Sequence, residues 1–164
     1  MNNPVSEHLL MQWKWMLQWM DWVFHELSDE DFKESVFDGG NTGIWILGHL
    51  IVSDDDLSLY FGKDSYLYPE YIDLFKSGTK PKPASEYPSI SELKEAWKKV
   101  CDKNEALYKE MTDEELNEPH ALYKNGEDNF VKTKGETASV WQLHQLYHAG
   151  QLGVLASKIK KQKS

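Results

Sequence analysis

Residues 144–155, HQLYHAGQLGVL, place two histidines four positions apart in a segment with helical character. Side chains at this spacing project from one face of a helix, with about 6 Å between their Cβ atoms. His144 and His148 can therefore point at one ion, as in helical zinc motifs. Two ordinary histidines packed in a core are the alternative for such a pair taken alone. Residue 145 is glutamine, so the base of the peptidase motif H-E-x-x-H is absent.

A third histidine lies in residues 41–50, NTGIWILGHL. His49 follows Trp45 by one helical turn, on a stripe that continues to Val52 or Ser53 and is expected to face the interior. Burying a histidine without a partner costs free energy. Three imidazoles around one divalent ion would explain His49, His144 and His148 together. Such a site keeps a coordination position open, as catalytic metal sites do.

Hydrophobic periodicity predicts four long helices, over about residues 5–27, 43–61, 89–111 and 137–160. Asn41 or Thr42 is expected to cap the second helix, and Ser139 with Gln142 to form a capping box on the fourth. The first helix carries a regular apolar stripe that should face the core. Its members are Leu9, Trp13, Met16, Met20, Val23 and Leu27.

The connections between these helices predict their arrangement. Residues 62–88 hold four of the six prolines and form a long link, which is expected to cross the molecule or cover a site. The sequence LSDEDFKE follows the first helix and MTDEELNE follows the third, a weak internal repeat. Asn125-Gly126 is typical of a hairpin turn in the last loop. We predict an all-α, pseudo-symmetric four-helix bundle, with residues 1–164 in one domain.

Four of the seven tryptophans fall between residues 13 and 22. Trp15, Trp19 and Trp22 form a second stripe on the first helix, away from the core stripe. One interpretation is a helix buried on all sides within its own bundle. The other is a homodimer, because aromatic residues are enriched at the centres of interfaces. We predict a homodimer through this helix.

Composition argues against nucleic-acid binding and limits how an anionic substrate can be held. The net charge is -9 and the basic residues number 18, all of them lysine. A nucleic-acid-binding protein needs a basic face, so we expect none here. Without arginine, an anionic substrate has to be held by lysine, a helix N-terminus or a metal. One cysteine, no signal-peptide pattern and no apolar run that could span a membrane favour a cytoplasmic protein.

The motifs around the three histidines give the chain a resemblance to the DinB-like, or YfiT-like, family of four-helix-bundle metalloproteins. It rests on NTGIWILGHL, on HQLYHAGQLGVL and on the long crossover after the second helix, and it covers nearly the whole chain. The family's triad, one histidine in the second helix and two in the fourth, falls on His49, His144 and His148. The resemblance implies a divalent metal, zinc or nickel first, and a low-molecular-weight thiol as a second cofactor.

The resemblance also implies a function. Characterised relatives are transferases that use bacillithiol or mycothiol and a mycothiol-dependent maleylpyruvate isomerase, and many members are named as metal-dependent hydrolases. We therefore expect a metal-dependent enzyme that acts on small molecules, of thiol-transferase or hydrolase type. The alternatives are a non-catalytic metal-binding or ligand-binding protein and a stress-related dimeric module.

Other residues are secondary candidates. Asp56 and Gln151 are nominated as acceptors that orient metal-bound imidazoles. His120, in a loop after Pro119, is a weaker candidate to approach the site. Tyr147 is expected to pack in the core, and Cys101 to be a small buried apolar residue. His8 and His25 are expected to be surface or packing residues.

Overall fold

The chain is helical in every long element. The structure, a computed structural model, describes residues 3–63, 65–125, 127 and 129–163, and these ranges contain helices and isolated bridges but no β-strand. The predicted all-α class is confirmed. In chain order the elements are α1 (Pro4–His25), η1 (Asp31–Lys33), α2 (Gly43–Asp55), α3 (Leu57–Tyr60), η2 (Pro69–Tyr71), α4 (Ile72–Phe75), η3 (Ala84–Glu86), α5 (Ile90–Glu110), α6 (Asp113–Leu116) and α7 (Lys134–Gln162).

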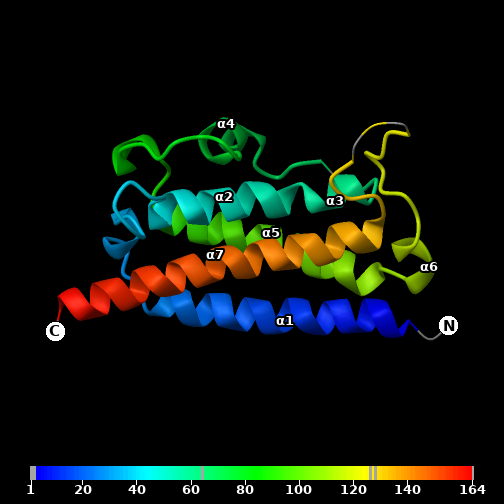
Figure 1. The fold of residues 1–164 in the computed structure, drawn as a ribbon, viewed down its shortest axis with the longest axis horizontal. Helices are drawn as coiled ribbons and strands as arrows, with labels where there is room; N and C mark the ends of the chain where they lie inside the picture. The colour runs from blue at the N-terminus through cyan, green and yellow to red at the C-terminus, as the bar shows by residue number, and fades with distance from the viewer. Residues whose placement is uncertain (1–2, 64, 126, 128, 164) are drawn as a thin grey trace.

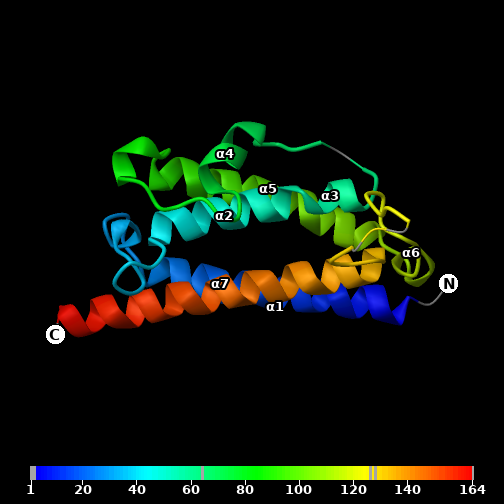
Figure 2. The same ribbon diagram turned by 45° about the horizontal axis from the view of Figure 1, so that its top comes forward.

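Four long helices, α1, α2, α5 and α7, form the bundle (Figure 1). Both α1 and α2 contact both α5 and α7. Two views show that α1 and α7 run in one direction while α2 and α5 run in the other (Figures 1 and 2). Because α2 and α5 are parallel, the chain must return along the bundle before α5 can begin. This return explains the length of the crossover that follows α3.

The crossover lies along α2 and is fixed to it at three levels. At the end of α2, the Asp55 carboxylate accepts a hydrogen bond of 2.7 Å from the backbone N–H of Leu67. Near the middle, Phe75 of α4 is fully buried where α4 contacts α2. At the start, the indole N–H of Trp45 donates to the Thr79 hydroxyl at 3.0 Å. The crossover therefore covers the α2 segment that carries His49.

The apolar stripe of α1 forms one wall of the core, and all six predicted members are buried: Leu9, Trp13, Met16, Met20, Val23 and Leu27. Trp13 is fully buried and stacks on Tyr108 of α5, with ring centroids 5.0 Å apart. The second stripe is different, because Trp15, Trp19 and Trp22 are 56%, 58% and 66% exposed. The interpretation of α1 as a helix buried on all sides is therefore wrong.

Helix starts follow local capping chemistry. Thr42 caps α2 and accepts from the Trp45 N–H, as predicted. The capping box predicted at Ser139 and Gln142 is wrong, because α7 begins earlier. Thr133 and Glu136 form that box, with the Glu136 N–H 3.1 Å from the Thr133 hydroxyl.

The early start of α7 depends on Gly135. A Cβ atom at this position would lie 2.9 Å from the backbone oxygen of Leu116, so only glycine lets α7 pack this closely on α6. In the sequence this glycine favours a loop, because glycine is common in loops and uncommon inside helices. That preference is why the predicted helix began too late.

The second helix is also shorter than predicted. It ends at Asp55, and the four-residue α3 begins at Leu57. Asp56 lies at the junction and is the C-cap of α2. Gly62 follows with a φ of 68°, a left-handed conformation that ends the helical segment as expected.

The two halves of the chain repeat one arrangement. Antiparallel bridges join Ser35 to Thr42 and Pro119 to Thr133, and both threonines are helix N-caps. The Pro119–Thr133 bridge closes the last loop, while the predicted turn at Asn125-Gly126 lies partly outside the described residues. Within the described ranges, no helix has both the length and the apolar character needed to cross a membrane.

Candidate metal centre

Three imidazoles meet between α2 and α7. The Nε2 atom of His144 lies 3.2 Å from Nε2 of His49 and 3.1 Å from Nε2 of His148. One ring nitrogen from each residue lies within 4.8 Å of the other two. Among the histidine, cysteine, aspartate and glutamate side chains that the structure describes, these three histidines form the group spaced closely enough to bind one metal ion. The three predicted candidates are brought together.

Hydrogen bonds on the far side of two rings determine which nitrogen carries the proton. His49 Nδ1 lies 2.8 Å from the carbonyl oxygen of Phe75, and only a protonated Nδ1 can donate to it. His148 Nδ1 likewise lies 2.8 Å from Oε1 of Gln151. Both Nε2 atoms therefore present lone pairs to the centre. The single ring of His144 can donate to only one of them, which leaves lone pairs facing each other unless a cation lies between them.

The Gln151 amide is itself oriented. Its Nε2 donates to the Tyr147 hydroxyl at 3.1 Å, and its Oε1 faces His148. Tyr147 is 64% exposed, and the expectation that it packs in the core is therefore wrong. It lines the open cavity beside the triad, and its hydroxyl supports the amide that holds the His148 ring.

Burial keeps the imidazoles neutral. Loss of solvent lowers the pKa of His144 and of His148 to about 4. His148 and His49 add to the shift of His144, whereas for His148 the hydrogen bond with Gln151 opposes the shift and His49 adds to it. Desolvation also lowers the pKa of His49, against a raising contribution from the hydrogen bond to Phe75. Near pH 7 all three rings are therefore in the neutral form that binds a metal. The donor set fits a divalent cation that accepts nitrogen ligands.

Aromatic packing positions the His49 ring from behind. Trp45 stacks on it, with centroids 4.8 Å apart and an interplanar angle of 10°. Gly48 lets the crossover approach, because a Cβ atom there would overlap the Phe75 ring. Trp45, Gly48 and Phe75 thus form a rigid support for one side of the triad.

An open cavity of about 490 Å³ adjoins the triad. Its walls are mainly aromatic and apolar, with two serines, Asp56 and the edges of two histidines as the polar groups. The lining residues are His49, Ser53, Asp56, Tyr60, Ser77, Phe130, Val140, Trp141, Leu143, His144 and Tyr147. A small molecule in this cavity would lie next to the meeting point of the imidazoles.

The nominated acceptors lie in different places. Gln151 contacts His148 directly. Asp56 lines the cavity and accepts a 2.8 Å hydrogen bond from the Trp141 indole. Within the described ranges, no hydrogen bond joins Asp56 to any of the three histidines.

The remaining histidines and the cysteine lie apart from the triad. His120 is buried and bonds the backbone oxygen of Val131 at 2.9 Å. It reaches the cavity only through Tyr60, whose ring is 5.0 Å away. His8 and His25 are exposed on α1. Cys101 is buried in α5 as expected, and burial raises its pKa well above the ordinary value.

The sequence did not reveal Phe75 or Thr79 as parts of the site. Phe75 acts through its backbone oxygen, which has no residue-specific signature, and Thr79 acts by fixing Trp45. The one available signal was the prediction that residues 62–88 cover a site. That prediction did not indicate which residue touches His49.

The sequence profile of the DinB superfamily matches residues 12–152, a span that includes all three histidines. The chain belongs to the DinB superfamily. The predicted family is therefore confirmed, and the helical bundle agrees with it. A comparison with curated proteins found no match. For this DinB superfamily protein, the family and the three-histidine cluster are compatible with metal binding.

Proposed function

We propose that this protein is a metal-dependent enzyme acting on small molecules, of thiol-transferase or hydrolase type. One observation carries the proposal. Three neutral imidazoles direct their free nitrogens to one point at the edge of an open cavity. A structural metal site is normally closed by four protein ligands, whereas three ligands beside a cavity leave room for a reacting molecule.

His49, His144 and His148 are the residues that would hold the ion, with zinc or nickel as the first choices. A bound divalent cation would favour the ionised form of a thiol or a water molecule, which is the nucleophilic form. The chain's own residues supply the rest. Phe75 and Gln151 orient two of the imidazoles, and the rings of Tyr60 and Trp141 form an apolar wall of the cavity.

A screen for metal-dependent turnover tests the proposal. Zinc-loaded and nickel-loaded protein would be incubated with low-molecular-weight thiols and model electrophiles, and with activated esters for hydrolysis. We expect consumption of substrate that stops on chelation and returns when metal is added back. Tight metal binding with no metal-dependent turnover of any pair would favour the alternative, a non-catalytic metal-binding protein.

We also propose that a second copy of the chain covers the exposed tryptophans of α1. Beside Trp15 and Trp19 runs a groove of about 470 Å³ between α1 and α7, with Leu143 and Leu146 on its other wall. Projecting rings and an apolar hollow on one face can fit each other across a two-fold axis. Large exposed aromatic patches of this kind are typical of interaction surfaces.

The mass in solution tests the dimer. We expect light scattering to give twice the chain mass of 19.1 kDa, and Trp19→Glu to give the mass of one chain. The charge would be buried without a partner at the centre of the interface, which is strongly unfavourable. Phe37→Glu is the matched control, because Phe37 is 62% exposed in a loop outside α1 and α7. A wild-type mass of one chain would contradict the proposal.

A further inference from the structure

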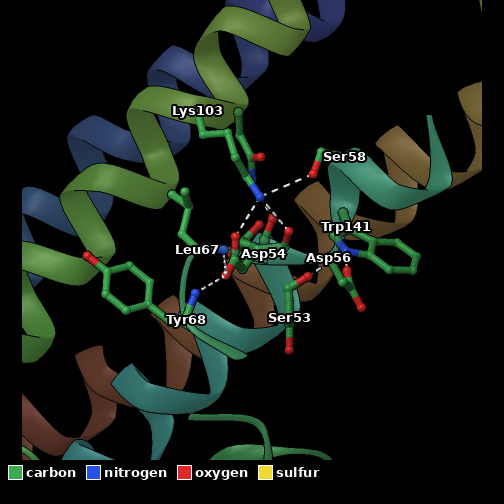
Figure 3. A network of polar contacts seen from close by, with 10 residues as sticks. Ser53, Asp54, Asp56, Ser58, Leu67, Tyr68, Lys103 and Trp141 are labelled. Carbon is green, nitrogen blue, oxygen red and sulfur yellow. Dashed lines mark hydrogen bonds and ion pairs between the residues drawn. The ribbon is translucent and has the colours of Figure 1, made fainter. Parts of the chain in front are cut away.

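Three consecutive aspartates at the end of α2 have three different surroundings (Figure 3). Successive helical residues are rotated by about 100°, so neighbours in the sequence face different partners. Asp54 is fully buried, and neither carboxylate oxygen has a hydrogen-bond partner within the described residues. Asp55 is also fully buried, whereas Asp56 lies at the helix junction and lines the cavity beside the histidines.

Asp55 is occupied by structural contacts. The Lys103 ammonium lies 2.5 Å from its Oδ1, and the backbone N–H groups of Leu67 and Tyr68 donate to its Oδ2. Lys103 also bonds the Ser58 hydroxyl at 3.1 Å, and Figure 3 shows these contacts converging on the end of α2. Asp55 therefore holds α5 and the crossover against α2, and as a fully buried residue that does not line the cavity it is out of reach of a molecule there.

Asp56 has a different arrangement. Its Oδ1 accepts from the Trp141 indole at 2.8 Å, and the same indole N–H lies 2.6 Å from the Ser53 carbonyl oxygen. These contacts fix the carboxylate against the cavity wall. Within the described ranges, no hydrogen bond engages Oδ2. This oxygen is also not one of the fully buried polar atoms that lack a hydrogen-bond partner, so solvent reaches it. It is therefore available to a molecule in the cavity.

We propose that Asp56 accepts the proton of the nucleophile that reacts in the cavity, a role that rests on the proposed function. The imidazoles of the site do not serve as the base. His144 would hold the ion through Nε2, which leaves its Nδ1 to carry the ring proton. His49 and His148 donate through Nδ1 to Phe75 and Gln151, and their other nitrogens face the centre of the triad. Asp54 is enclosed in the core. Asp56 is thus the carboxylate on the cavity wall with a free oxygen.

The electrostatic surroundings suit this role. Burial raises the pKa of Asp56 to about 7, Asp55 adds to the increase, and the Trp141 hydrogen bond and the Lys103 charge oppose it. Burial raises the pKa of Tyr60 in α3 and of Tyr66 in the crossover, and the charge of Asp56 adds to the increase for each. An acid with a pKa near the working pH takes up and returns protons most effectively.

The reaction step balances without a further reagent. The S–H bond of a bound thiol breaks, and its proton passes to Oδ2 of Asp56. The sulfur electron pair forms a C–S bond with the electrophilic carbon, and the bond from that carbon to the leaving group breaks. The leaving group departs with the bonding pair and takes the proton from Asp56, which restores the carboxylate.

The number of protons released when a thiol binds tests the role of Asp56 without a measurement of turnover. Calorimetric titration of nickel-loaded protein with 2-mercaptoethanol, at roughly pH 7.5 in two buffers of different ionisation enthalpy, gives the protons released per thiol bound. In the wild type we expect clearly less than one proton, because the negative charge of the bound thiolate raises the pKa of Asp56 further and the carboxylate then keeps part of the proton. In Asp56→Asn we expect about one, because the amide keeps the Trp141 hydrogen bond but cannot be protonated. Asp73→Asn, at an exposed carboxylate in α4, should match the wild type.

The outcomes separate this inference from the proposed function. A change in near-ultraviolet absorption of the nickel-loaded protein reports thiol binding independently of heat. If the thiol binds and both proteins release equal numbers of protons, the role of Asp56 is overturned while the thiol function stands. If no thiol binds to either protein, the thiol function fails and the role of Asp56 fails with it. Metal content measured on the same samples shows that the triad is loaded in each case.

Discussion

Replacing His144 with alanine is expected to weaken metal binding so far that the ion is lost on dialysis. The wild type should bind about one divalent ion per chain, as a three-histidine site requires. In His144→Ala the affinity should fall by at least roughly 100-fold, because changes to the outer contacts of metal-bound histidines alone cost 10–100-fold. His144 is central to the cluster, since both of the short nitrogen–nitrogen distances involve its Nε2. Elemental analysis after exhaustive dialysis, with zinc and nickel in turn, measures the effect.

The control separates loss of a ligand from loss of a histidine. His8→Ala removes an exposed imidazole from α1 and should retain the full metal content. The fold of His144→Ala should persist, because His144 is partly exposed and the core residues around α7 remain. Circular dichroism and the thermal midpoint of the metal-free proteins check this. Equal metal content in His144→Ala and His8→Ala would refute the three-histidine site.

The sequence predicted those parts of the structure that arise from local periodicity. The core stripe of α1 follows from the spacing of its apolar residues, and all of its members are buried. The pairing of His144 with His148 follows from helix geometry, because residues four apart share a face. His49 comes close to these two residues only through the packing of the bundle. The repeated order of helix, acidic turn, loop and helix indicated that bundle.

What the sequence could not predict depends on contacts between distant segments. The proton position on His49 is determined by the backbone oxygen of Phe75, 26 residues away, and any residue type could supply that atom. The start of α7 depends on how closely Gly135 approaches α6. Helical phase separates the directions of Asp54 and Asp56, but the partner that occupies each carboxylate comes from another element.

The crossover connects the stability of the fold with the geometry of the metal centre. Phe75 is fully buried and stacks on Tyr87, with centroids 4.9 Å apart, so its ring has no free space to move into. Its carbonyl oxygen accepts the Nδ1–H of His49. A displacement of Phe75 therefore moves the acceptor that orients one of the three imidazoles.

Gly48→Ala should make this connection measurable. The new methyl group would overlap the Phe75 ring, and overpacking of this kind costs about 1–3 kcal/mol. Gly150→Ala is the matched control, because it makes the same substitution in α7 where nothing lies within 4 Å of the added carbon. There alanine should stabilise the helix by up to about 1 kcal/mol. Urea unfolding of both metal-free proteins should therefore show free energies of unfolding that differ by roughly 1–4 kcal/mol.

The same pair of variants tests whether the crossover orients the metal centre or only covers it. If the Phe75 carbonyl fixes the His49 ring, Gly48→Ala should weaken metal binding by about 10-fold or more, as loss of an orienting acceptor does. Gly150→Ala should leave the affinity unchanged. Competition with a chromophoric chelator under conditions where both proteins are folded measures this directly. Reduced stability with unchanged affinity would show that His49 is held by its own helix and by Trp45, which stacks on its ring.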